Sequence, residues 1–177
     1  MNEFEFTLKF QLANAEINPD RYASELYGNG CDDAVIGVGR KGKIAFQFTR
    51  EAESAQIAIL SAIGDVRKTI PDVKLIEASP DFVGISELAQ ILDCTRQNVR
   101  ILIERAFDAP PAVHEGTSSL WHLADLLLWL KDSKAYAIDP VLLEVAQTTR
   151  LINSVRNFEA LQTIDPSQRD NLVLMVA

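Results

Sequence analysis

A short stretch near the middle of the chain carries side chains that suit contact with DNA bases and phosphates. Residues 96–106 hold three arginines against a single carboxylate. In the major groove Arg can bridge two acceptors of guanine, Gln or Asn can bridge adenine, Glu can accept from cytosine, and an apolar side chain can meet the thymine methyl group. At helical spacing one face centres on 97, 100, 101 and 104, with 96, 98 and 105 on its flanks. The expected DNA-binding residues are Thr95, Arg96, Gln97, Asn98, Arg100, Ile101, Glu104 and Arg105.

Two short amphipathic helices would position this face. Apolar residues recur at i, i+3, i+4 and i+7 in two places, at Ile85, Leu88, Ala89 and Leu92, and again at Val99, Leu102, Ile103 and Ala106. The spacing predicts helices at about 85–92 and 95–106, with only three residues between them. So short a connection makes the two apolar stripes pack at a steep angle, as in a helix-turn-helix. Thr95 is the expected N-cap of the second helix, and the free backbone N–H groups after it, with Arg96, suit a phosphate oxygen.

A small hairpin or wing is expected at 110–121, followed by a third helix at 121–131. The order resembles the winged helix of MerR-like regulators and excisionase-like proteins, and the likeness rests on five pieces of sequence: Ile85–Ala89, Cys94–Arg100, Pro110–Pro111, Leu120–Trp121, and the positions Asp125 and Trp129. The resemblance implies binding to double-stranded DNA and a role in transcription regulation. Where those relatives usually carry a basic residue in the wing, this chain has His114 and Glu115.

A wider resemblance covers residues 4–130. The segments that carry it are Asp32–Gly39 with Gly42, Phe48–Ala52 and Pro80–Gly84. They are similar to a group of small bacterial proteins described as DNA-binding. This likeness supports the pairing of the two domains and implies no mechanism for the first one.

The first 80 residues predict a ferredoxin-like domain. Large apolar residues alternate with polar ones in the opening segment, which places five side chains on one face of a strand: Phe4, Phe6, Leu8, Phe10 and Leu12. A helix follows at 19–27, with Asn18 as its N-cap, then strands at 34–38 and 44–48, a helix at 51–69 and a strand at 73–78. This β-α-β-β-α-β order is typical of helices on one face of a sheet. We expect the fold class to be α+β.

The last 46 residues predict a long helix at about 139–161 and an apolar tail. A seam at alternating three- and four-residue steps, beside Leu142, Leu151 and Phe158, favours a homodimer: Ile138, Val141, Val145, Thr148, Ile152 and Val155. The tail after Asp165 is a strand or a docking segment. The expected domains are therefore 1–80, a winged helix-turn-helix at 81–131, and a C-terminal helix and tail at 132–177.

Composition limits the DNA hypothesis and excludes other classes. The net charge is −8, and no domain is basic overall, so contact with DNA has to be local. Several motifs are discounted: the GxGxxG at 37–42 precedes a strand, the Asp32–Asp33 pair suits a turn, and neither the two histidines nor the two cysteines have zinc-ligand spacing. We expect no enzyme activity, cofactor, metal or membrane span, and a cytoplasmic location. The alternative is an antitoxin, immunity or phage-defence module whose helices bind a protein partner.

Overall fold

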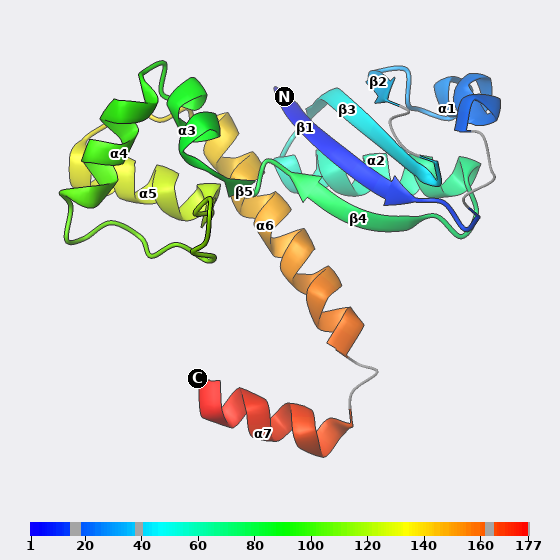
Figure 1. Ribbon diagram of the computed structural model, residues 1–177. Coiled ribbons are helices and arrows are strands. Elements are labelled where there is room, and N and C mark those ends of the chain that lie inside the picture. The colour runs from blue at the N-terminus through cyan, green and yellow to red at the C-terminus, as the bar shows by residue number, and fades with distance from the viewer. Residues whose placement is uncertain (15–18, 38–40, 162–164, 177) are drawn as a thin grey trace.

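The first part of the chain forms one antiparallel sheet of four strands (Figure 1). The strands are β1 (Asn2–Gln11), β2 (Ala34–Gly37), β3 (Lys43–Ala52) and β4 (Lys74–Ser79), and they lie in the order β2-β3-β1-β4. In the central pair Phe6 lies opposite Phe48. The elements follow one another as β1, α1, β2, β3, α2 and β4, which is the predicted β-α-β-β-α-β order. The chain is therefore an α+β protein, as expected.

This computed structural model describes residues 1–14, 19–37, 41–161 and 165–176. Helix boundaries in the first part differ from those expected from sequence. The predicted helix at 19–27 is a 3-10 turn, Pro19–Tyr22, followed by α1 (Ala23–Gly28), and its predicted cap Asn18 lies outside the described residues. The strand β3 continues to Ala52, so α2 (Ala55–Thr69) starts later than predicted, and Ser54 caps it by accepting from Ile57 N–H at 3.2 Å.

One face of the sheet is buried and the other is open. The five alternating side chains are all at most 3% exposed, which confirms the predicted apolar face; four lie in β1, and Leu12 follows directly after its last residue. Helix α2, behind the strands in Figure 1, covers this face with Ala58, Ile59, Ala62 and Val66, none of which is exposed. Residues between the buried positions of β1, such as Glu5 and Lys9, face solvent.

The glycine-rich segment at 37–42 leads into a strand. Gly37 is the last residue of β2, and β3 begins at Lys43. No helix N-terminus follows the glycines, so the segment does not have the strand-to-helix context that a dinucleotide site needs. Positions 38–40 of the motif lie outside the described residues.

Three helices and a two-stranded sheet form the second part of the chain. The helices are α3 (Ile85–Ile91), α4 (Arg96–Glu104) and α5 (Leu123–Lys134), and the strands are β5 (Phe82–Val83) and β6 (Trp121–His122). The prediction that the third helix begins at 121 is wrong. Trp121 and His122 pair with Val83 and Phe82 in an antiparallel ladder instead, so the helix starts at Leu123.

The long helix α6 (Pro140–Leu161) packs against both parts of the chain. Val145 lies in the core of the sheet, where it is 1% exposed, whereas Leu143 and Ala146 lie in the core formed with α3, α4 and α5. Within the predicted dimer seam, Val141, Val145 and Ile152 therefore pack against the chain's own sheet. Only the later part of α6 extends beyond the sheet (Figure 1).

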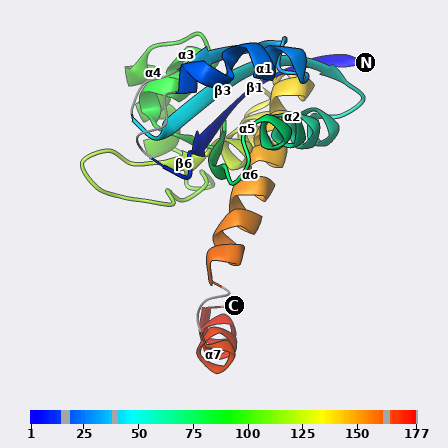
Figure 2. The same ribbon diagram turned by 90° about the vertical axis from the view of Figure 1, so that its right-hand side faces the viewer.

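The tail is helical. The helix α7 (Pro166–Val176) occupies the segment for which a strand or a docking segment was predicted, so the strand alternative is wrong. Figures 1 and 2 both show α7 standing clear of the sheet and of α2. Among the described residues, no helix combines the length and the apolar character needed to cross a membrane.

Candidate nucleic-acid interface

The turn between α3 and α4 sets the position of the predicted DNA-binding helix. The backbone N–H of Cys94 donates to the carbonyl of Ala89 at 2.9 Å, which closes the end of α3. Asp93 adopts a left-handed conformation with φ of 47°, and this conformation reverses the chain within the short connection. Thr95 Oγ1 then accepts from Asn98 N–H at 3.2 Å, which confirms Thr95 as the N-cap of α4.

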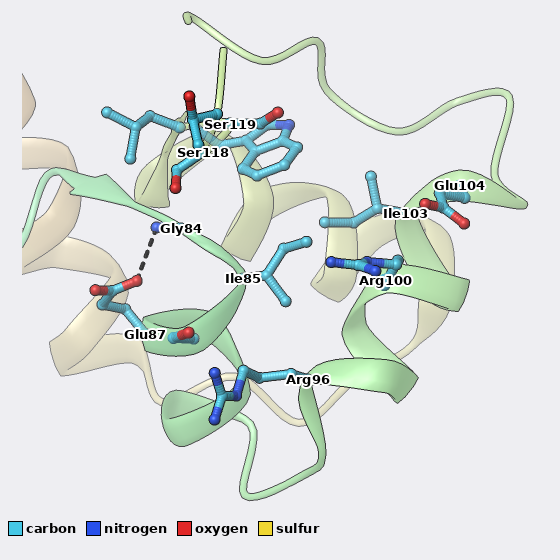
Figure 3. Close-up of a pocket in the computed structure, with 13 residues that line it drawn as sticks. Gly84, Ile85, Glu87, Arg96, Arg100, Ile103, Glu104, Ser118 and Ser119 are labelled. Carbon is cyan, nitrogen blue, oxygen red and sulfur yellow. Dashed lines mark hydrogen bonds between the residues drawn. The ribbon is translucent and has the colours of Figure 1, made fainter. Parts of the chain in front are cut away.

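A groove of about 600 Å³ runs between the start of α3, one face of α4 and the loop that precedes β6 (Figure 3). Its α4 wall consists of Arg96, Arg100, Ile103 and Glu104. Its opposite wall consists of three successive hydroxyl residues, Thr117, Ser118 and Ser119, together with the segment 120–121. In Figure 3, Ile85, Arg100 and Ile103 point toward the middle of this space.

Both long walls of the groove carry hydrogen-bond donors, and the α4 wall also carries the exposed carboxylate of Glu104. Neither Arg96 nor Arg100 forms an ion pair within the part of the chain that the structure describes. A guanidinium is a donor only, and a serine or threonine hydroxyl can donate as well. The carboxylate of Glu87 is already engaged, since it accepts from Gly84 N–H at 3.1 Å. The donors of this lining suit an acceptor-rich anion such as a phosphodiester.

The predicted residues divide between this groove and the rest of α4. Arg96, Arg100 and Glu104 line the groove, and the structure brings them together with the hydroxyl wall. Three others are exposed outside it: Gln97, Asn98 and Arg105. Ile101 is half-buried and does not line the groove, so it is less accessible than the helical phase indicates.

Sequence reasoning missed the hydroxyl wall. The run 117–119 was assigned to a hairpin and given no role, although three adjacent hydroxyls after Gly116 were a usable signal. It also assigned Ile103 only to the apolar stripe, whereas this side chain is half-buried and borders the groove as well. The wing itself is a loop closed by a single bridge between His114 and Leu120, in which Leu120 N–H donates to His114 O at 3.0 Å.

Asp81, between β4 and β5, holds β6 and the loop that precedes it in place. Asp81 is 1% exposed, and its Oδ1 lies 2.6 Å from Nδ1 of His122. Its backbone carbonyl accepts from Leu123 N–H at 2.7 Å, at the start of α5. Asp81 is therefore a buried anchor for the wall opposite α4.

A second polar cluster lies at the edge of the large sheet. The guanidinium of Arg50 contacts Asp33 at 2.6 and 3.0 Å and Asp65 at 3.0 Å. Burial lowers the pKa of Arg50, but hydrogen bonds and charges of Asp33 and Asp65 outweigh it, so the pKa is raised. Asp33 is thus tied to β3 and α2 by Arg50, whose charge matches its own.

Burial also affects a nearby thiol. Cys31 is 1% exposed, and burial, followed by the charge of Asp65, raises its pKa to about 11. The thiol therefore stays protonated and unreactive. Among the described residues, no group of three His, Cys, Asp or Glu side chains lies close enough to hold a metal ion.

Comparison with known protein families, curated proteins and solved structures found no match to this chain.

Proposed function

We propose that the protein binds double-stranded DNA sequence-specifically as a transcription regulator, with α4 in the major groove. In this proposal, residues 81–131 act as a winged helix-turn-helix, and the first domain is a ferredoxin-like unit for assembly or sensing. One observation carries the proposal: Arg96 and Arg100, one helical turn apart and without ion pairs among the described residues, line the same groove as a row of hydroxyls, and Arg100 points into it (Figure 3).

The groove would take the sugar–phosphate backbone at the edge of the helix. Arg96, next to the N-terminus of α4, and Ser118 and Ser119 on the opposite wall would donate to phosphate oxygens, which fixes the position of the protein on the duplex. Arg100 lies one turn further along the same face and would reach a guanine edge. Gln97, which is exposed, would reach an adenine.

The acidity of the chain limits where DNA can lie. With a net charge of −8, the protein has no broad basic surface to attract DNA, so affinity must come from the few cations of α4. Few phosphate contacts imply a shallow dependence on salt. The proposal therefore predicts weak non-specific binding and a clear preference for one short sequence.

Selection of bound fragments from a random double-stranded DNA library tests this proposal. The purified full chain is used at two salt concentrations, and the enriched site is then measured with Arg100→Ala. If Arg100 binds a base through two hydrogen bonds, Arg100→Ala is expected to weaken the free energy of DNA binding by about 1–3 kcal/mol. The variant should also lose the base preference at one position of the site. The matched control is Arg21→Ala, since Arg21 is an exposed arginine in the first domain and lies over the Tyr22 ring, away from the groove.

The proposal is contradicted if no sequence is enriched from the library at either salt concentration. If the wild type, Arg100→Ala and Arg21→Ala bind an enriched site with equal affinity, the proposed contact between α4 and the bases is wrong. A folded state has to be established for each variant by circular dichroism, so that loss of binding is assigned to the contact.

Net acidity supports a second candidate, a protein-interaction module such as an antitoxin, immunity or phage-defence partner. The same α4 face would then meet a partner protein. DNA selection separates the two candidates, because the second one predicts no enriched sequence.

A further inference from the structure

An apolar groove of about 580 Å³ lies between α2 and the C-terminal half of α6, beside the start of β4. Its walls include Leu60 and Ile63 of α2 and Leu151, Ile152 and Val155 of α6. Leu60 is 50% exposed, Leu151 59% and Val155 54%. Large contiguous apolar surfaces of this kind mark interaction sites.

The exposed apolar face continues along α6 beyond the groove. Up to position 159, where the description of burial in that helix ends, Asn153 is the last buried residue, and residues 154–159 are all exposed. Leu151, Val155 and Phe158 recur at i, i+4 and i+7, so they share one face, and Phe158 is 50% exposed. Two turns of α6 thus present an apolar face that does not pack against the chain's own sheet.

The helix α7 has properties that match this groove. It spans eleven residues, and a helix this short is marginal in water unless a surface supports it. Its sequence ends in the apolar run 172–176. The segment 165–176 carries two carboxylates, Asp165 just before α7 and Asp170 within it, against one cation, Arg169, so its net charge is negative. The groove is lined by three cations, Arg67, Lys74 and Arg156, and by one carboxylate, Glu159. The groove is thus apolar with a net positive charge, and the segment 165–176 is opposite to it in net charge and shares its apolar character.

The arrangement of the helices points to a second copy as the source of α7. Both views show α7 lying clear of the body of its own chain, separated from the groove beside α2 (Figures 1 and 2). Exchange of an identical end segment between two copies repeats the same contact twice and closes a two-fold dimer at low cost. We propose that the groove between α2 and α6 binds α7 of a second copy, so that two chains exchange their C-terminal helices.

This proposal does not depend on DNA binding, and its test uses no DNA. The mass in solution of the full chain, measured at tens of micromolar by sedimentation or light scattering, is expected to be twice that of the 19.6 kDa chain. Val155→Asp, which places a charge in the groove, and a chain that ends at Leu161, which lacks α7, are each expected to be monomers. The matched control is Val35→Asp on β2, because Val35 is 71% exposed and lies outside the groove.

A mixing experiment distinguishes exchange from docking of α7 within one chain. Val155→Asp keeps an intact α7, and the shortened chain keeps an intact groove. An equal mixture of these two monomers is expected to form a heterodimer with one exchanged helix. A monomeric full chain, a shortened chain that dimerises as well as the full chain, or a mixture that stays monomeric would each overturn the proposal. Circular dichroism establishes that both variants are folded.

Discussion

The Nδ2 atom of Asn153 donates to Oδ2 of Asp81 at 2.8 Å, although 72 positions separate the two residues. The same amide group pairs with Ala78 in both directions, accepting from its N–H at 2.9 Å and donating to its carbonyl at 2.8 Å. Thus a single side chain of α6 forms hydrogen bonds with the backbone near the end of β4 and with Asp81, which lies between β4 and β5. Because Asp81 also contacts His122, the position of α6 is coupled to the wall of the candidate DNA groove.

Replacing Asn153 by Ala is expected to lower the free energy of unfolding by roughly 2–3 kcal/mol, because buried polar groups at Ala78 and Asp81 lose their partner. Urea denaturation of the full chain measures the change. Asn157→Ala provides the control, since Asn157 is exposed on the same helix and its loss should stay within about 0.5 kcal/mol. Equal effects at the two positions would show that the Asn153 amide has no special role.

Replacing Arg50 by Met is expected to cost about 3–5 kcal/mol, because two carboxylates of low exposure lose their shared cation. The side chains of Arg50, Asp33 and Asp65 are 10%, 26% and 17% exposed. The control within the same cluster is Lys68→Ala. Lys68 contacts Asp65 at 2.9 Å, but it is 71% exposed, so its loss should cost below about 1 kcal/mol. Thermal or urea unfolding of both variants measures the loss in the free energy of unfolding. A loss for Arg50→Met as small as that for Lys68→Ala would contradict the prediction.

The left-handed conformation of Asp93 predicts an order of stability among variants at the turn. With φ of 47°, a side chain other than Asn or Asp is disfavoured there, whereas glycine adopts this conformation freely. Asp93→Gly should therefore be more stable than Asp93→Ala by about 1 kcal/mol. Chemical denaturation checks the order, and a more stable Asp93→Ala would mean that the turn has a different conformation in solution.

The two cysteines are expected to differ sharply in reactivity. Cys94 is exposed, whereas Cys31 is buried and its pKa is raised to about 11, so its reactive thiolate is scarce at pH 8. Treatment of the folded chain with iodoacetamide at pH 8 should add one label, and treatment after unfolding should add two, as measured by intact mass. Equal labelling rates for both thiols in the folded chain would be incompatible with this burial.

The raised pKa of Cys31 also predicts a loss of stability at high pH. Below the ordinary value of 9.0 the thiol is neutral in both folded and unfolded chains, and its contribution is complete. As the pH rises from there toward about 11, the unfolded chain releases a proton that the folded chain retains, so this contribution falls. Denaturation at pH 8 and pH 10, with Cys31→Ala as the control, should show a smaller decrease for the variant.

Within the proposed DNA interface, Arg96 and Gln97 are expected to behave differently although they are neighbours. Arg96→Ala removes a phosphate contact, so affinity should fall by a similar factor on every sequence, and the slope of log affinity against log salt should become shallower by about 1. Gln97→Ala should instead relax the preference at one base pair and leave the salt slope unchanged. Titrations on the selected site and on single-base variants of it measure both effects. The same behaviour for both variants would contradict the division of roles.

The sequence by itself determined the features that depend on neighbouring residues. Alternation of large apolar and polar residues identified the buried face of β1, because successive side chains of a strand point to opposite faces. Two matched apolar stripes and Thr95 identified α3, α4 and the N-cap, since a cap involves only a hydroxyl and a backbone group three positions away. Helix boundaries were less accurate where a strand continued, as at Ala52, because tertiary pairing lengthened it.

Only the tertiary structure decided which distant groups meet. Arg50 finds its partners 15 and 17 positions away, and Asn153 finds Asp81 across 72 positions, because the packing of whole helices and strands sets these distances. The hydroxyl wall faces Arg100 for the same reason: β5 and β6 pair, and that pairing carries the loop before Trp121 over α4. Periodicity within an element shows which side chains share a face, but the ladder between two elements determines what that face contacts.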